Sequence, residues 1–235
     1  MDVKRLTVRE YRKLKSEMGI SVIGNKAYKI CPEQAIEVMR VVDIYKDKAN
    51  ADVLLPDAYL SFKGMFVGYR MPYLKDYITV GDALTDGVKF NKLDIVRRVM
   101  NVVFELLDHE VSYVDMHVYN VMFKDDDVKV IDISDVSLED NEIISYGLVE
   151  FIFNTLYGED IPFFRLRNLV EDDRFREYFS EEFMDYVKLA CEYKREIDAR
   201  RILDYFHELE DEITNNKVAK LAKKLHQEGG LKYRL

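Results

Sequence analysis

The spacing of apolar residues changes character near residue 72. Before that point, short runs with apolar side chains at alternating positions predict strands at residues 19–30, 53–62 and 65–74. The dipeptide Lys63-Gly64 between the last two runs is typical of a tight hairpin turn. We also expect a polar helix over residues 1–18 and a second helix over residues 32–45. The first third of the chain is therefore predicted to form a small sheet with helices.

Helical spacing dominates the rest of the chain. Residues 91–110 carry apolar side chains at intervals of three and four, which predicts an amphipathic helix. The segments on either side of the acidic run 125–127 predict two short strands joined by a turn. Residues 143–158 are apolar nearly all round, which predicts a buried central helix. Charged amphipathic helices are expected over residues 165–228, and the residues after Thr214 are rich in lysine.

Composition and charge narrow the classes of function. The chain has 235 residues, of which 48% are hydrophobic, so it can bury a sizeable core. The net charge of −9 argues against nucleic acid as the main partner. Two distant cysteines make no disulfide framework, and neither a signal peptide nor a membrane-spanning run is evident. We expect a cytoplasmic protein, and delivery as an effector stays open as an alternative.

Two acids and one amide stand among residues that favour burial. Asp115 and Asn120 bracket a loop after the long helix, and Asp132 follows the second strand of the predicted hairpin. Because a hairpin folds back on itself, Asp132 should return close to Asn120. Their oxygen atoms suit Mg²⁺, while the carboxylate of Asp115 could accept a proton. Burying such groups is costly unless they are paired or bind metal, so the pattern indicates a site.

The same stretch resembles the protein kinase superfamily. Y-V-D-M-H-V-Y-N at residues 113–120 is similar to the catalytic loop H-R-D-x-x-x-x-N, and I-D-I-S-D at 131–135 is similar to the D-F-G metal site. Further similarities follow in the expected order over residues 19–160. A-Y-K-I at 27–30 is similar to the V-A-I-K strand, and M-P-Y-L at 71–74 is similar to the hinge between the lobes. S-Y-G and L-Y-G within residues 145–158 are similar to the pattern of the central helix. The resemblance implies an α+β, two-lobed kinase-like fold with a β-rich lobe at 1–72, a helical lobe at 73–235, and a short or absent activation segment.

The resemblance also implies roles at the reacting phosphate. Asp115 would orient or deprotonate the substrate hydroxyl, and Asn120 and Asp132 would hold Mg²⁺. Lys29 would contact the nucleotide phosphates and be steadied by Glu37, which we prefer because Val38 and Val41 give it an apolar flank.

The remaining implied contacts are to the nucleotide. Gly24 would contribute to a sparse glycine loop over the phosphates, although a turn glycine is the simpler interpretation. Met71, Pro72 and Leu74 would form the hinge, in which the Pro72 carbonyl and the Leu74 amide bond adenine.

Several positions depart from the family pattern. Val114 replaces the arginine that pairs with a phosphorylated activation loop, which argues against control by such phosphorylation. His117 makes the loop D-x-H-x-x-N, which is closer to the aminoglycoside and choline kinase relatives. Only residues 133–142 separate Asp132 from the predicted central helix, so no ledge for an extended peptide is evident. Minimal kinases among bacterial and viral effectors are similarly reduced.

These observations predict an ATP- and Mg²⁺-dependent phosphotransferase. We favour a minimal protein serine/threonine kinase that recognises a folded protein partner through its surface, without nucleic acid or membrane. Two alternatives stay open. One is a small-molecule kinase, indicated by Asp115-Met116-His117, and the other is a pseudokinase that serves as a binding module, indicated by the sparse glycine loop.

Overall fold

The computed structural model describes most of the first two thirds of the chain. The described residues are 2–16, 19–47, 51–109, 112–113, 115–132, 136–137 and 144–158, with the isolated positions 171, 173, 181, 184, 185 and 188. Apart from those positions, the helices predicted over 165–228 and the lysine-rich tail lie outside the described residues. Within the described ranges, no helix has both the length and the apolar character that crossing a bilayer requires.

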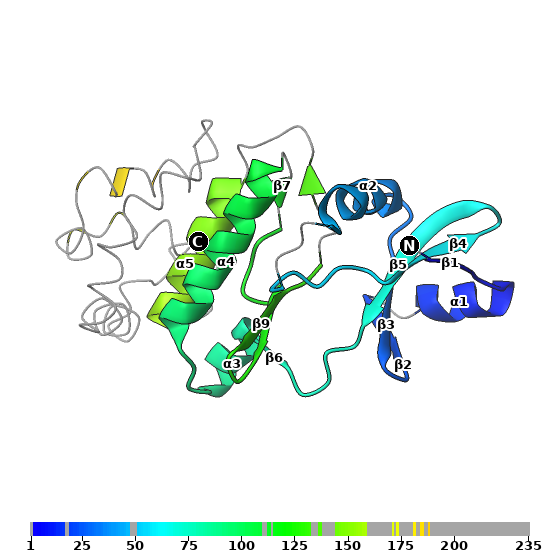
Figure 1. The fold of residues 1–235 in the computed structure, drawn as a ribbon. Helices are drawn as coiled ribbons and strands as arrows, with labels where there is room; N and C mark the ends of the chain where they lie inside the picture. The colour runs from blue at the N-terminus through cyan, green and yellow to red at the C-terminus, as the bar shows by residue number, and fades with distance from the viewer. Residues whose placement is uncertain are drawn as a thin grey trace, which may run out of the picture.

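A five-stranded sheet contains the described strands up to Pro72 (Figure 1). Its strand order is β1-β4-β5-β3-β2, and all neighbours are antiparallel except β1 and β4, which are parallel. The strands are β1 (Asp2–Arg5), β2 (Ile20–Ile23), β3 (Lys26–Ile30), β4 (Ala58–Phe62) and β5 (Met65–Pro72). The turn predicted between β4 and β5 is confirmed. Lys63 and Gly64 both have positive φ, at 51° and 81°, as a tight hairpin turn requires.

The prediction of one helix over residues 1–18 is wrong at its start. Residues 2–5 form β1, and helix α1 spans only Val8–Ser16. A reciprocal cap sets this boundary, because the Thr7 hydroxyl accepts from the Glu10 amide while the Glu10 carboxylate accepts from the Thr7 amide. The segment before the cap is free to pair with the edge of β4, and local spacing of residues cannot reveal that pairing.

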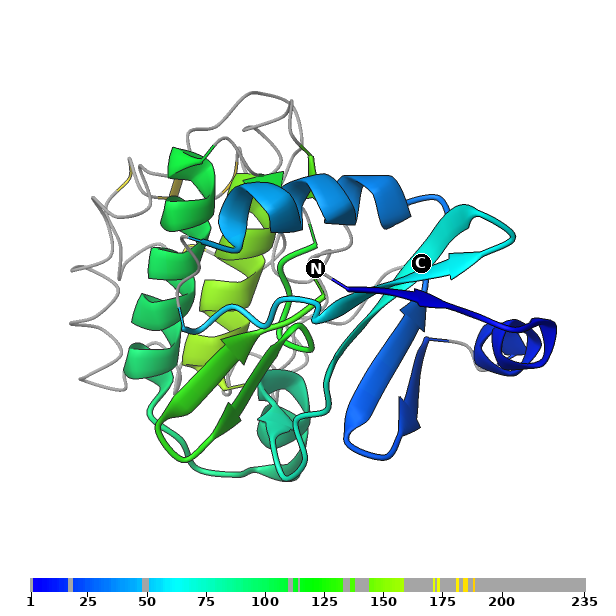
Figure 2. The same ribbon diagram turned by 45° about the vertical axis from the view of Figure 1, so that its right-hand side comes forward.

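Helices cover both faces of the sheet (Figures 1 and 2). α1 packs on one face, where Leu14 joins Tyr28, Leu60 and Val67 in a small apolar cluster. α2 (Ala35–Tyr45) packs on the opposite face and belongs to the main core with Tyr59, Tyr69 and Met71. The predicted start of α2 is too early, since residues 32–34 form a turn. Ala27 and Lys29 alternate with Tyr28, so they face the same side as α2.

The rest of the described chain is built on two helices that lie side by side (Figure 1). They are α4 (Lys92–Asp108) and α5 (Ile144–Tyr157), which confirm the predicted amphipathic and central helices. The Asn91 side chain caps α4 by accepting from the Asp94 amide, and residues 147–149 and 151–155 of α5 are buried. A short helix that we did not predict, α3 (Val80–Asp86), is capped by Thr79 and ended by Gly87 in the left-handed conformation.

Short strands complete this part. β8 (Val121–Lys124) and β9 (Asp127–Val130) form the predicted hairpin, and β6 (Ile78–Thr79) pairs with β8. β7 (Ser112–Tyr113) pairs with β10 (Val136–Ser137). The hairpin therefore has Asn120 directly before it and Asp132 two residues after it.

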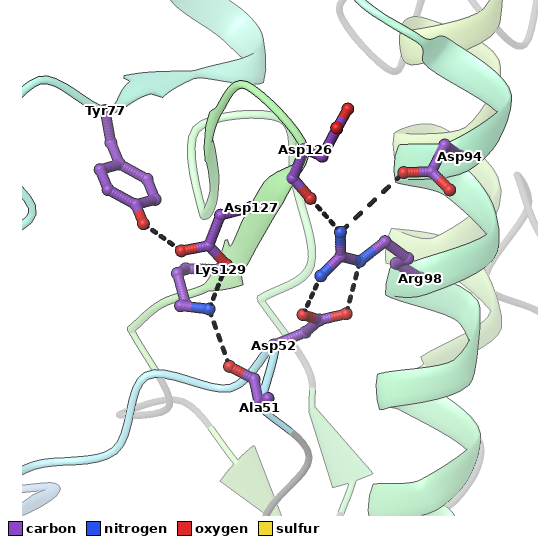
Figure 3. Close-up of polar contacts among 8 residues, drawn as sticks. All are labelled: Ala51, Asp52, Tyr77, Asp94, Arg98, Asp126, Asp127 and Lys129. Carbon is purple, nitrogen blue, oxygen red and sulfur yellow. Dashed lines mark hydrogen bonds and ion pairs between the residues drawn. The ribbon is translucent and has the colours of Figure 1, made fainter.

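A connection after α2 ties the sheet region to the hairpin. Val53 forms a parallel bridge with Val130, and the Leu54 amide donates to the Val130 carbonyl over 2.9 Å. Figure 3 shows Asp52, which is only 7% exposed, held by the guanidinium of Arg98 from α4. A buried carboxylate needs such a partner, and this one fixes the connection against β9 and α4.

Candidate active site

An ion pair joins the two parts of the molecule. The Lys29 Nζ atom, on β3, lies 2.5 Å from Oδ1 and 2.6 Å from Oδ2 of Asp132. Tyr69, the cross-strand partner of Lys29 on β5, donates its hydroxyl to the same Oδ1 over 3.0 Å. The side chains of Lys29 and Asp132 are 20% and 18% exposed, so solvent reaches them only in part. An amine and a carboxylate 103 positions apart thus meet, as the resemblance to kinases implies.

The backbone at Asp132 is unusual. Its φ of 58° lies in the left-handed region, which is uncommon for a residue other than glycine. Such a conformation costs free energy and persists only where surrounding contacts impose it. Here the bonds to Lys29 and Tyr69 hold the side chain, and the Ile131 amide bonds to the Asn120 carbonyl over 2.9 Å. This outlier supports assigning a function to Asp132.

Asn120 links the hairpin to the loop of Asp115. Its Nδ2 donates to the Asp115 carbonyl over 2.8 Å and to the Asp115 Oδ2 atom over 3.1 Å. The hairpin register pairs Val121 with Val130, so Asn120 stands opposite Ile131 and beside Asp132. The structure therefore brings Asp115, Asn120 and Asp132 together. Asn120 is 6% exposed, whereas the Asp115 side chain is 46% exposed and accessible to a substrate.

His117 lies next to the candidate base. Its Nε2 atom is 3.5 Å from the Asp115 Oδ2 atom, and its Nδ1 atom accepts from the Tyr119 amide over 3.1 Å. The Asp115 carboxylate raises the pKa of His117, with smaller contributions from the charges of Glu150 and Asp132, while burial opposes the rise. An imidazolium is thereby favoured at the edge of the site, where negative charge from a phosphate would be attracted.

A cavity of about 370 Å³ adjoins these groups. Its apolar walls come from the sheet, the hairpin and the connection after α2: Ile20, Val22, Ala27, Leu54, Met122 and Ile131. The hinge predicted at residues 71–74 lines one side, and Asn120 and Asp132 line another. The Leu74 amide has no backbone acceptor among the described residues, while the Tyr73 amide already donates to Asn25. A largely apolar cavity with the Leu74 amide on one side and polar groups on another suits a nucleotide.

The donor set near the cavity also suits a divalent cation. Both described side-chain bonds of Asn120 are donated by Nδ2, which leaves its Oδ1 as a possible hard oxygen ligand. The Asp132 carboxylate lines the same cavity and supplies two hard oxygen atoms, each of which can accept more than one contact. Magnesium keeps several waters and phosphate oxygens among its ligands, so two protein oxygens fit its requirements.

The structure places Glu37 at an exposed position and Gly24 in a turn. Glu37, predicted to steady Lys29, is exposed on α2, and the carboxylate that holds Lys29 is that of Asp132. Val38 is buried, but consecutive positions on a helix point in different directions, so the burial of this neighbour was a poor guide to the side chain of Glu37. Gly24 has a φ of 64° and forms the β2–β3 turn, as the simpler interpretation had it, and phosphate contact there stays a prediction.

Other contributors to the site were not identified from the sequence. Tyr69 gave no local signal, because its role depends on pairing with Lys29 across the sheet. Ile20 and Val22 could have been found, since alternate residues of a strand that borders a cleft share one face. Met122 follows Asn120 by two positions on β8, so the same argument predicts that it faces the cavity.

Comparisons with known proteins bear on the fold. No protein-family model matches the chain, and no curated protein matches it in sequence. Among solved structures, the Neurospora crassa PAN3 pseudokinase is similar, with a TM-score of 0.53 and 8% sequence identity. The match covers 88% of this chain but 57% of that one, so this chain spans less than two thirds of its neighbour. At such low identity the likeness concerns the fold alone, and it agrees with the arrangement described above: the chain has a two-lobed, kinase-like α+β fold.

Proposed function

We propose that the protein is an ATP- and Mg²⁺-dependent phosphotransferase, and specifically a minimal protein serine/threonine kinase. The observation that carries this proposal is the contact of Lys29 with Asp132 beside a nucleotide-sized cavity. A kinase-like fold by itself does not imply activity, so the argument rests on the groups at the site. An amine, two hard oxygen donors and an accessible carboxylate are the groups that phosphoryl transfer needs.

Each side chain has a distinct role in the proposed reaction. Lys29 binds the phosphates of ATP as a point charge, and Asn120 and Asp132 supply oxygen ligands to Mg²⁺. When bound, Mg²⁺ neutralises charge on the phosphates. Asp115 orients the acceptor hydroxyl and takes its proton as the new bond from oxygen to the γ-phosphorus forms and the bond to the β-phosphate oxygen breaks, which releases ADP.

Support for a kinase with a protein substrate comes from the central helix. Gly147, in the S-Y-G segment of α5, packs against the backbone of Met116 so closely that a Cβ atom there would lie 2.9 Å from the Met116 oxygen. The helix thus buttresses the loop that carries Asp115, in keeping with the resemblance of this segment to protein kinases. The contact of His117 with Asp115 instead favours the small-molecule kinase, which remains the second candidate.

Nucleotide binding and phosphoryl transfer test the proposal in sequence. We expect ATP to raise the melting temperature only when Mg²⁺ is present. With radiolabelled ATP and cell extract, the wild-type protein should label protein bands that are lost with Asp115→Asn. Asp2→Asn is the matched control, because Asp2 is an exposed aspartate on edge strand β1.

The outcomes separate the candidates. Labelling in a protein-free metabolite pool, with none in protein, would favour the small-molecule kinase. Absence of any melting shift at millimolar ATP and Mg²⁺ would favour a pseudokinase that acts as a binding module, an alternative consistent with the exposed position of Glu37.

A further inference from the structure

A second cavity lies at the turn of the β8–β9 hairpin. Its volume is about 610 Å³, and it is bounded by the hairpin, by β6 and the residues before it, by the connection from α3 to α4 and by the first turn of α4. Its apolar lining comprises Ile78, Val88, Phe90, Ile95, Phe123 and Val128. The Phe90 and Phe123 rings contact each other at a centroid distance of 4.9 Å. Val88 is 43% exposed, so an apolar side chain is presented to solvent. We call this cavity the hairpin groove.

Acidic side chains surround the hairpin groove. Four aspartates and two lysines line it: Asp76, Asp94, Asp125, Asp126, Lys89 and Lys124. The Lys124 Nζ atom lies 3.7 Å from a carboxylate oxygen of Asp76, so these two charges largely offset each other. Asp125 and Asp126 are both exposed at the hairpin turn. The rim therefore carries excess negative charge beside apolar surface.

The rim is held in place by an arginine. Figure 3 shows the Arg98 guanidinium between α4 and the hairpin turn, where it bonds to the Asp126 carbonyl and lies 4.0 Å from the Asp94 carboxylate. The same guanidinium forms two bonds with Asp52. Because Asp126 contacts Arg98 through its main chain, its carboxylate is not consumed by this contact. Fixed rim groups lower the ordering cost of binding a partner.

The hairpin groove is close to the candidate active site but does not overlap it. Asn120 and Asp132 lie at one end of the β8–β9 hairpin, and the turn that borders the groove is at the other end. Four residues of strand separate the two ends, which corresponds to roughly 13 Å. A segment bound in the groove would therefore leave Asp115 open and would raise the effective concentration of the attached substrate.

We propose that the hairpin groove docks a basic segment with apolar anchor residues that belongs to the protein substrate. The substrate assignment rests on the proposed kinase function, whereas the binding chemistry rests on the groove itself. Arginine or lysine side chains complement the acidic rim, and leucine-sized side chains cover the exposed apolar surface. Nucleic acid does not fit, because its phosphates would meet the same acidic rim. Since only residues 133–143 separate Asp132 from α5, docking away from the site gives a compact kinase a means of holding a protein.

Three labelled synthetic peptides test the docking chemistry by fluorescence anisotropy. The first alternates arginine and leucine, the second has glutamate in place of arginine, and the third has serine in place of leucine. We expect saturable binding below about 100 µM for the first peptide alone. Asp125→Lys combined with Asp126→Lys should weaken that binding about tenfold or more, because both changes reverse charge on the rim. Charge reversal at the exposed residues Asp43 and Asp47 of the α2 region is the matched control and should leave binding unchanged.

A second pair of variants tests the apolar surface. Val88→Ser should also weaken the binding of the arginine–leucine peptide, whereas Ile36→Ser, at a 57% exposed position on α2, should not. All of these positions are exposed, so the variants should fold. The melting shift with ATP and Mg²⁺ is measured on each of them as a check of the nucleotide site.

The results keep the two proposals apart. Equal binding of all three peptides, no binding, or equal losses in the groove and control variants would overturn the docking proposal even if phosphoryl transfer occurs. If the protein binds the arginine–leucine peptide selectively, loses that binding when the rim is changed and shows no transferase activity, the docking proposal is supported and the proposed kinase function is refuted.

Discussion

Replacement of Lys29 by methionine is the most informative single change. Methionine retains much of the apolar stem but removes the charge that lies 2.5 Å from the Asp132 carboxylate. Two unit charges about 4 Å apart attract each other by about 4 kcal/mol at an effective dielectric constant of about 20. Lost hydration offsets part of this, so a charged hydrogen bond contributes about 1.5–3 kcal/mol. We expect Lys29→Met to lower the free energy of unfolding by about 2 kcal/mol, because the partly buried Asp132 carboxylate loses the charged amine of Lys29 and keeps the neutral hydroxyl of Tyr69.

A matched control lies on the same strand. Lys26 is also a partly exposed β3 lysine, but it contacts Asp57, which keeps the guanidinium of Arg70 when Lys26 is changed. Lys26→Met should therefore cost less than about 1 kcal/mol. Positions 26 and 29 point to opposite faces of the strand, so only Lys29→Met should abolish the melting shift with ATP and Mg²⁺.

Urea unfolding and thermal shift, measured side by side on both variants, test whether the contact between Lys29 and Asp132 stabilises the fold and supports a nucleotide site. Unfolding midpoints with equal slopes give the stability difference between the two variants. If Lys29→Met unfolds at the same urea concentration as Lys26→Met and still responds to ATP with Mg²⁺, then the contact with Asp132 supports neither the fold nor a nucleotide site.

Three further changes probe the neighbouring groups. Gly147→Ala would place a Cβ atom 2.9 Å from the Met116 oxygen, so the helix or the loop must move apart. This movement should lower the free energy of unfolding by about 1–3 kcal/mol, as measured by urea titration. Unchanged stability would contradict this packing. Because Asp115 raises the pKa of His117, the stability from this pair is fully present below the ordinary histidine pKa and is lost as pH rises through the raised pKa. His117→Gln should remove that pH dependence from urea unfolding, and a wild-type histidine NMR titration without an upward shift would count against the contact. Tyr69→Phe removes the hydroxyl donor to Asp132, the proposed magnesium ligand, and should weaken the Mg²⁺-dependent ATP shift. An undiminished shift would rule out that role of Tyr69.

Local sequence was a sound guide where short-range chemistry sets the structure. The Lys63-Gly64 turn needs two residues at positive φ, and the alternation on either side fixes the strands. The cap formed by Thr7 and Glu10 is equally local, and attention to the T-x-x-E pattern would have placed the start of α1 correctly. The approach of Asp132 to Asn120 also follows locally, because one short hairpin joins them.

Contacts between distant segments were beyond the reach of residue spacing. The parallel pairing of residues 2–5 with β4 joins strands more than 50 positions apart, so local periodicity holds no record of it. The outward position of Glu37 depends on how α2 rotates against the sheet. The contact of Tyr69 with Asp132 requires that β3 pairs with β5 and that the β8–β9 hairpin packs against this sheet.

By itself, the sequence determined most of the strand and helix types, with β1 and α3 as exceptions, together with the hairpin that carries the site and which acids and which amine should meet. Those features depend on alternation, capping and turn chemistry over a few residues, together with one family resemblance. The tertiary structure alone decided other contacts: Tyr69 with Asp132, Arg98 with buried Asp52, and an acidic groove beside exposed Val88. Side-chain partners follow from how elements pack, and packing depends on the whole set of contacts, which no local pattern encodes.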